Sequence, residues 1–293
     1  MEPMHVYAVR TVDHHLQILQ DAAGDAATQP GVSAIHHLRV SVRRFSQTLT
    51  VFEQFLPAAA VKKIRRRLKK LMRLSSSVRN CDIALEFLEE TRGTSPALKP
   101  VRTRLTQERI ERGAEFAALL QRWHTRAFAP RWRAALNLPP GGIRMQSTET
   151  RELWDPEAGA AENAHAVLPG LASQYFSAGR KAVREKASHR KLHRFRLKTK
   201  RFRYTLELFH EFYDASFDVR LCRIREIQTR LGKMSDHATM ADLFEDDPAL
   251  AQGARRRAAK HAEEFAAYWM GEFDKEGEEE RWAGYLEQPV AVP

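Results

Sequence analysis

The sequence predicts an all-α protein, and three observations support this prediction. The 293 residues include only 14 glycines and 13 prolines, so few residues interrupt a helix. Leucine, alanine, arginine, glutamate and lysine, which favour helices, are frequent along the whole chain. No segment alternates polar and apolar residues over a length typical of a strand. With 43% hydrophobic and 29% charged residues, the chain has the composition of a folded protein with a substantial core.

The expected helices lie between breaks that glycine, proline and acidic turn residues mark along the chain. These breaks fall at residues 24–31, 57, 93–100, 138–142, 156–159, 214–218 and 246–248. The segments between them have ordinary helical lengths. The weakest helical pattern inside the chain runs from 137 to 159, where prolines and glycines cluster, so we expect a linker there.

A repeat within the sequence predicts two related halves. Residues 36–45 (HHLRVSVRRF) align without a gap with residues 193–202 (HRFRLKTKRF). The match resumes about thirty residues later with a slip of one position, which places Val78 on Met234. We expect a first helical half at 5–136, a linker at 137–159, a second helical half at 160–275 and a C-terminal tail at 276–293.

Each copy of the repeat, taken as a helix, has a basic face and an apolar face. In the first copy His36, Arg39 and Arg43 share the basic face, opposite an apolar face of leucine, valine and phenylalanine. The polar face of the second copy carries His193, Arg196, Lys200, Arg203 and Tyr204. A row of arginine, lysine and histidine donors along a helix suits an elongated anion.

The positive charge of the chain is concentrated in these regions. The net charge is +11, yet residues 31–80 and residues 180–204 each contain twelve lysines and arginines and a single acid. Residues 61–73 form a second amphipathic segment without any acid, and its cations include Lys62, Lys63, Arg66, Lys69, Lys70 and Arg73. Like charges on neighbouring turns repel one another, so this distribution predicts a polyanionic ligand.

Four segments in this order resemble the CHAD family, the conserved histidine α-helical domain. They are H-x-x-R-V-x-x-R-R at 36–44, VRNCD at 78–82, H-x-x-R-x-x-x-K-R-x-R-Y at 193–204 and LGKMSD at 231–236. The resemblance covers residues 5–275. Asn80 stands where the family usually has Asp, and Ser76 where Gly is common, so the role of that Asp is not carried over to Asn80.

The resemblance implies two helical bundles related by a pseudo-twofold axis around a central basic groove or cavity that binds inorganic polyphosphate. It also implies a location at polyphosphate granules, with other granule-associated proteins as further partners. Carried over by position, the phosphate-facing residues are His36, Arg39, Arg43, Arg44, His193, Arg196, Lys200, Arg201 and Arg203, with Tyr204 and the 61–73 cations beside them.

Nucleic acid is the first alternative ligand, because its phosphates attract the same cations. Proteins that bind single strands place aromatic side chains among those cations, so that bases can stack on them. Here the phenylalanines lie opposite the basic face and chiefly Tyr204 remains on it. We therefore expect nucleic acid to bind only as a weaker competitor.

A metal-binding helical-bundle enzyme is the second alternative. Glu162-x-x-His165 and Glu207-x-x-His210 have the spacing found in di-iron bundles, but the further glutamates such a site needs are not evident. Glu207 could instead pair with Arg203, and we expect no catalytic residue, metal or cofactor. Ser75, Ser76, Ser77 and Ser235 are expected to cap helices, and the five tryptophans to anchor packing. The chain has no apolar run long enough to span a membrane, which predicts a cytoplasmic protein.

Overall fold

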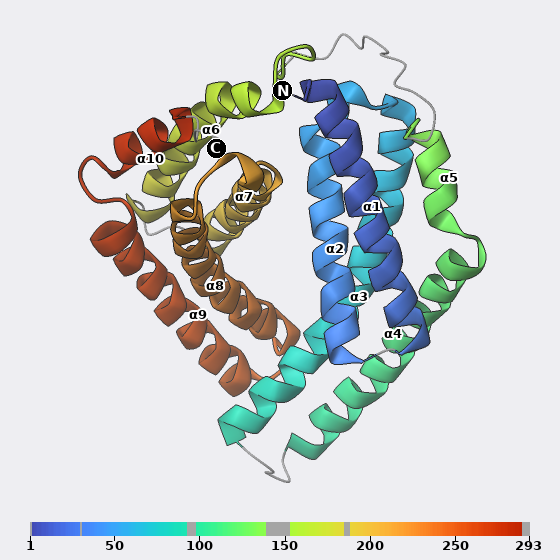
Figure 1. Cartoon of the computed structure of the whole chain (residues 1–293). Coiled ribbons are helices and arrows are strands. Elements are labelled where there is room, and N and C mark those ends of the chain that lie inside the picture. Colours follow the sequence, from blue (N-terminus) through green and yellow to red (C-terminus); the bar gives the residue numbers. More distant parts are fainter. Residues whose placement is uncertain (1, 30, 93–97, 139–152, 185–187, 289–293) are drawn as a thin grey trace. The chain divides into compact units, whose positions relative to one another are not determined.

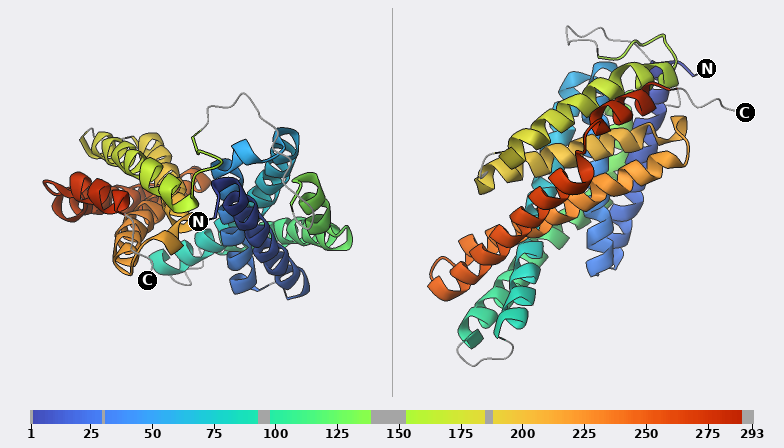
Figure 2. Two further views of the ribbon diagram at one scale, coloured as in Figure 1. Left: turned by 45° about the horizontal axis from the view of Figure 1, so that its top comes forward. Right: turned by 90° about the vertical axis from the view of Figure 1, so that its left-hand side faces the viewer.

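The computed structural model describes residues 2–29, 31–92, 98–138, 153–184 and 188–288. In this part of the chain all regular structure is helical, apart from one isolated antiparallel bridge between Pro3 and Gly159. The all-α prediction is confirmed. The chain divides into an N-terminal unit, His5–Glu152, and a C-terminal unit, Leu153–Pro293 together with Met1–Met4 (Figures 1 and 2). Each unit is described by itself.

The N-terminal unit consists of long helices with short connections. Its elements are α1 (Met4–Thr28), α2 (Val32–Val51), the 3-10 helix η1 (Glu53–Phe55), α3 (Ala58–Arg92), α4 (Lys99–Thr125) and α5 (Phe128–Ala135). α3 packs against α2, and farther along its 35 residues against α4 (Figure 1). Helix α1 runs through the break predicted to start at residue 24, because one glycine inside a helix is tolerated.

The apolar face predicted for α2 forms the core of this unit. Leu38, Val42, Phe45, Leu49 and Phe52 are each at most 1% exposed. Burying a side chain of this size stabilises the fold by roughly 1.5–3 kcal/mol. The opposite face of α2 is therefore fixed toward solvent and α3, which determines where its basic residues lie.

The C-terminal unit repeats the same order of elements. They are α6 (Ala160–Arg184), α7 (His189–Leu208), the 3-10 helix η3 (His210–Phe212), α8 (Ser216–Leu243), α9 (Pro248–Tyr268), the π-helical turn η4 (Trp269–Phe273) and α10 (Glu278–Glu287). As in the N-terminal unit, a 25-residue helix, a 20-residue helix and a three-residue 3-10 helix precede a long helix. This order agrees with the sequence repeat, and the pseudo-twofold axis stays a prediction.

Aromatic side chains dominate the core of the C-terminal unit. Tyr175 stacks on Phe202 with ring centroids 4.5 Å apart, and Trp269 packs on Phe273 at 4.8 Å. Gly179 lies so close to Trp269 that an added Cβ would be 2.0 Å from the indole ring. Only glycine fits at this crossing of α6 with η4.

Two predicted boundaries change in the structure. Helix α10 lies within the predicted tail and packs against α6, with Trp282 and Leu286 both 0% exposed. The tail prediction is wrong for these residues, since a short helix with two large apolar side chains can complete a core. Most of the predicted linker, residues 139–152, lies outside the described residues.

The described end of that linker is held by backbone hydrogen bonds to the start of the chain. The amide of Met4 donates to the carbonyl of Ala158 at 2.9 Å, and the amide of Ala160 donates to Glu2 at 3.1 Å. Trp154 is 1% exposed. These residues therefore belong to the C-terminal unit rather than to a loose connection.

Candidate anion-binding site

Helix α2 presents His36, Arg39 and Arg43 on one side, and we call these residues the α2 row. His36 is exposed, while Arg39 and Arg43 are half-buried beside α3. The Nη1 of Arg39 donates to the Ser75 hydroxyl at 2.7 Å and to the Ser76 hydroxyl at 3.1 Å. Hydroxyl acceptors orient a guanidinium without neutralising its charge, so the two serines position Arg39 within the α2 row.

The environment of His36 is strongly cationic. Although His36 is exposed as a whole, partial loss of solvent around its imidazole is the largest cause that lowers its pKa, followed by the charges of His37, Arg43, Arg39 and Arg79. Arg79 comes from α3, so two helices contribute cations around one imidazole. His36 is therefore neutral at neutral pH, and an anion bound beside it would raise its pKa.

Helix α7 presents His193, Arg196 and Lys200 in the same way, and we call these residues the α7 row. The Nδ1 of His193 lies 3.3 Å from the Ser235 hydroxyl on α8. Burial again lowers the pKa of this histidine most, and Arg196, His189 and Lys200 lower it further. Both copies of the repeat thus hold a neutral histidine among cations.

The helices that face the two rows carry different residues at the matched position nearest the histidine. In the sequence repeat Val78 aligns with Met234, so Arg79 aligns with Ser235. Arg79 influences His36 and Ser235 contacts His193, which shows that the aligned positions face the equivalent histidine in both units.

Sequence reasoning missed the role of these serines. Ser75, Ser76 and Ser235 were expected as helix caps, but they lie inside α3 and α8. The prediction was wrong because neither helix begins after the serines. All three lie on the helix that follows a basic row in its unit, and this position is the signal that could have revealed them.

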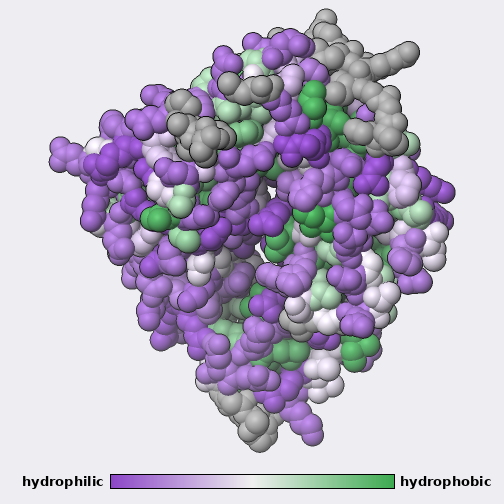
Figure 3. Space-filling view, viewed as in Figure 1, coloured by the Kyte–Doolittle hydropathy of each residue, from purple (hydrophilic) through white to green (hydrophobic). Residues whose placement is uncertain are grey.

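Helix α3 adds exposed cations. Lys62, Lys63, Arg66, Lys69, Lys70 and Arg73 are all exposed, as predicted for a cationic face. Within residues 61–73, Arg65 pairs with Glu53 at 3.3 Å, and the other cations have no ion pair with a described acid. Hydrophilic side chains cover most of the visible surface of each unit (Figure 3).

These α3 cations do not all lie on one side of the helix. At about 100° per residue, Lys62, Arg66, Lys69 and Arg73 share a stripe, which we call the α3 stripe. Lys70 is nine residues before Arg79, which places the two side chains about 180° apart. Lys63 also points away from Arg79 by the same reckoning. The structure therefore does not bring Lys63 or Lys70 to the α2 row.

Arg44 and Arg201, the last arginines of the two repeats, lie apart from the rows. Arg44 is half-buried. Burial is the main cause that lowers the pKa of His15 on α1, and the charge of Arg44 lowers it further, so Arg44 lies on the side of α2 that faces α1. Arg201 is exposed on α7. The structure thus places Arg44 on a different side of α2 from Arg39.

Arg203 and Tyr204 correct the predicted polar face of α7. They are 8% and 6% exposed, and Arg203 donates to Gln228 at 2.9 Å and to Glu207 at 2.5 Å. The Arg203 guanidinium lies 4.4 Å from the centre of the Tyr204 ring. The Arg203–Glu207 pair expected from spacing is confirmed, and it leaves neither residue on the exposed row.

The arginines of α8 are also engaged within the fold. Arg223 pairs with Glu278 and donates to the carbonyls of Glu272 and Phe273 at 2.8 and 3.0 Å. Arg230 pairs with Glu226 of the same helix at 2.5 Å and lies 4.2 Å from the centre of the Tyr268 ring on α9. Arg220 lies 3.6 Å from the centre of the Tyr285 ring. These side chains tie α8 to neighbouring elements instead of facing an external anion.

The residues of the two Glu-x-x-His pairs have other partners. Glu207 binds Arg203, His210 lies 3.0 Å from Asp218, and His165 packs edge-on against Tyr213 at 5.4 Å. Among the residues that the structure describes, no group of three or more His, Cys, Asp or Glu side chains could hold a metal ion. Within the same residues, no helix has the length and apolarity needed to cross a bilayer.

Comparison with known proteins identifies the family to which the chain belongs. The fold is similar to the crystal structure of the CHAD domain from the plant Ricinus communis, with 19% identity, a TM-score of 0.64 and coverage of 99% of this chain and 93% of that one. It is also similar to PptA from Streptomyces chartreusis, with 16% identity, a TM-score of 0.60 and coverage of 91% and 96%. No curated protein sequence matches the chain. Because the CHAD domain family model matches residues 10–245, the chain belongs to the CHAD family.

Proposed function

We propose that this chain binds inorganic polyphosphate without cleaving it. The observation that carries the proposal is the duplicated row, in which a neutral histidine and two cations line one side of the second helix of each unit. Arginine and lysine bind phosphate oxygens through charge-assisted hydrogen bonds. The α3 stripe supplies four more exposed cations for a long anion.

The rows suit holding the anion better than cleaving it. They consist of hydrogen-bond donors, and no carboxylate that could act as a general base belongs to either row. Membership of the CHAD family supports the same ligand. The groove shared by the two halves stays a prediction, as does association with polyphosphate granules.

The lack of aromatic platforms supports polyphosphate over nucleic acid. Tyr204, the aromatic residue expected on the basic face, is buried under Arg203. Phe195 and Phe202 are buried on the other side of α7. Among the described residues of the two rows, a single strand would find cations for its phosphates but no exposed phenylalanine, tyrosine or tryptophan ring for its bases.

A competition assay tests the choice of ligand. Labelled long-chain polyphosphate is bound at fixed ionic strength and displaced by unlabelled polyphosphate, RNA, single-stranded DNA or pyrophosphate. We expect polyphosphate to compete best at equal total charge, and affinity to fall steeply with salt as counter-ions are released. Equal competition by RNA at equal charge would contradict the proposal.

Substitution tests the site itself. Combining Arg39→Ala, Arg43→Ala, Arg196→Ala and Lys200→Ala should weaken binding about 100-fold, from ~0.7 kcal/mol for each lost contact. The control is Arg255→Ala with Arg256→Ala, which removes two exposed charges from α9 and should leave affinity within about twofold for that smaller loss of charge. In cells that contain polyphosphate granules, the tagged wild-type chain should concentrate at them and the quadruple variant should not. Full affinity in the folded quadruple variant would place the site elsewhere.

A further inference from the structure

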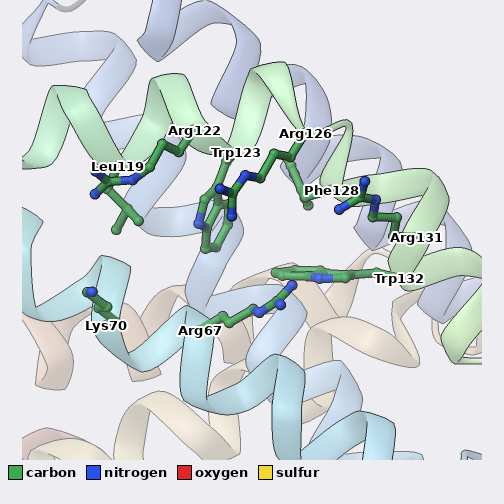
Figure 4. A pocket seen from close by; sticks show the side chains of 9 residues that line it. All are labelled: Arg67, Lys70, Leu119, Arg122, Trp123, Arg126, Phe128, Arg131 and Trp132. Atoms are coloured by element: carbon green, nitrogen blue, oxygen red, sulfur yellow. The ribbon is translucent and has the colours of Figure 1, made fainter.

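A cavity in the N-terminal unit lies between α3, α4 and α5, outside the α2 row. Its volume is about 240 Å³. Its lining residues are Arg67, Lys70, Leu119, Arg122, Trp123, Arg126, Phe128, Arg131 and Trp132. Figure 4 shows both indoles turned toward α3 and Arg67 reaching toward them from that helix.

The floor of the cavity is aromatic and tightly packed. Trp123, Phe128 and Trp132 are 8%, 8% and 3% exposed. Trp132 stacks on Phe45 with ring centroids 6.1 Å apart, and Trp123 meets it edge-on at 5.2 Å. Such packing holds the rings in place before any ligand arrives.

The indole N–H of Trp132 is buried and has no hydrogen-bond partner among the described residues. A buried donor without a partner typically costs about 1–3 kcal/mol. A ligand with an acceptor atom in the cavity would remove this cost. The five tryptophans were predicted to anchor packing, and all are buried. Trp282 also has a buried indole N–H without a partner among the described residues, but Trp282 does not line this cavity.

Five cations surround this floor without an acid in the lining. Arg67, Lys70, Arg122, Arg126 and Arg131 are all exposed, and none has an ion pair with a described acid. Arg122 and Arg126 are one helical turn apart, where like charges repel. The rim is therefore suited to an anion of several charges.

We propose that this cavity binds a nucleotide that carries two or three phosphates. The ligand must combine several negative charges with a flat, largely apolar part that offers hydrogen-bond acceptors, and a nucleotide has all of these. The cavity has room for about eight waters at ~30 Å³ each, which suits a heterocyclic base rather than a whole nucleotide. The base would lie against the indoles and the phosphates on the rim arginines.

The cavity and the α2 row use different sides of α3. Arg67 is eight residues before Ser75 and nine before Ser76, the two residues that hold Arg39, so its side chain points about 80° and about 180° away from theirs. Lys70, which the sequence assigned to the polyphosphate site, lines this cavity instead. The nucleotide site is therefore separate from the row of the proposed function and can be tested independently.

Calorimetric titration without divalent cations tests the proposal on the full chain. The probes are ATP, ADP, adenosine and inorganic triphosphate. We expect ATP to bind at least tenfold more tightly than adenosine, which lacks charge, and than triphosphate, which lacks a base. Equal affinity for ATP and triphosphate would overturn the nucleotide assignment and leave a plain anion site.

Variants separate the two sites. Arg122→Ala with Arg126→Ala should weaken ATP binding at least tenfold and leave the affinity for long-chain polyphosphate within twofold of wild type. Arg39→Ala with Arg43→Ala should weaken polyphosphate binding and leave the affinity for ATP within twofold. Trp132→Phe keeps the ring packing but removes the donor, and it should weaken ATP binding about fivefold, as loss of one hydrogen bond of ~1 kcal/mol does. Arg255→Ala with Arg256→Ala is the charge-matched control. Unchanged ATP affinity in the folded Arg122/Arg126 variant would overturn the proposal.

Discussion

Helices α3 and α8 occupy the same place in the order of their units, but their arginines are used differently. The first half of α3 exposes cations, among which Arg65 has an acidic partner. On α8, Arg223, Arg225 and Arg230 each lie beside a glutamate, and Arg220 lies on a tyrosine ring. The basic rows on α2 and α7 are alike, whereas the helices that face them have diverged.

This difference indicates that the two units contribute unequally to anion binding. Charge that is already neutralised within the fold gives little affinity for an external anion, while exposed, uncompensated charge does. We therefore expect α3 to contribute affinity and α8 to contribute stability. The predictions below test this division.

Arg223→Met should give the largest effect and should act on stability. It removes one of the two arginine partners of Glu278, which keeps Arg281, and it also removes the hydrogen bonds to the carbonyls of Glu272 and Phe273. The loss of these three charge-assisted contacts should lower the free energy of unfolding by about 3 kcal/mol. Urea denaturation measures this change. Arg66→Met on α3 is the matched control and should change stability by less than ~0.5 kcal/mol. Equal decreases in the free energy of unfolding of the two variants would contradict the different roles assigned to α3 and α8.

Removing the α3 stripe should act on affinity. The combined change of Lys62, Arg66, Lys69 and Arg73 to Ala should weaken polyphosphate binding about 30-fold, or about 2 kcal/mol for four exposed charges. The slope of log affinity against log salt should also become shallower, because fewer counter-ions are released. Fluorescence anisotropy at several salt concentrations measures both. If the variant kept the affinity and the salt slope of the wild type, the α3 stripe would not contact the anion.

The serines that hold Arg39 should have a smaller effect. Ser75→Ala with Ser76→Ala removes the two acceptors that orient the guanidinium and should weaken polyphosphate binding about fivefold, or ~1 kcal/mol. Ser235→Ala, on the equivalent helix of the other unit, should change affinity less than twofold, because its contact with His193 is long at 3.3 Å. The reverse order of effects would contradict the assigned roles.

The histidines should give the smallest effect, as a dependence on pH. Cations and burial lower the pKa of His36 and His193, and bound phosphate should raise it, so binding takes up protons. Affinity should rise about threefold as pH falls from about 8 to about 6. Combining His36→Ala and His193→Ala should remove the trend, and calorimetry in buffers of different ionisation enthalpy should detect proton uptake in the wild type alone.

The free protein should respond to pH with the opposite sign. Because the pKa of these histidines is lower in the folded state, the unfolded chain binds protons first, and the free energy of unfolding falls as pH drops through about 6.5.

Exchanging Arg79 and Ser235, the matched residues that face the two histidines, tests whether they cause the difference between the two units. Arg79→Ser should raise the pKa of His36 and Ser235→Arg should lower that of His193, as histidine NMR signals would report.

The sequence predicted the rows because a repeat and helical periodicity leave few ways to arrange them. Leu38 and Phe45 had to be buried, so His36 and Arg39 had to lie on the other face. Arg203 escaped this reasoning, because its burial depends on Gln228 and Glu207 rather than on its position in the repeat. The cavity beside Trp132 was not predictable, since its walls come from three helices that carry no shared motif.

The hydrogen bonds of Glu2 and Met4 affect the order in which the chain can fold. Their partners, Ala160 and Ala158, are synthesised roughly 155 residues later, which takes roughly 10–30 s at typical translation rates. The helices of the N-terminal unit can therefore assemble on the ribosome well before this contact closes. A fragment that starts at residue 153 would leave the carbonyl of Ala158 and the amide of Ala160 without these partners. Studies of the isolated C-terminal unit should restore residues 1–4, for example by circular permutation.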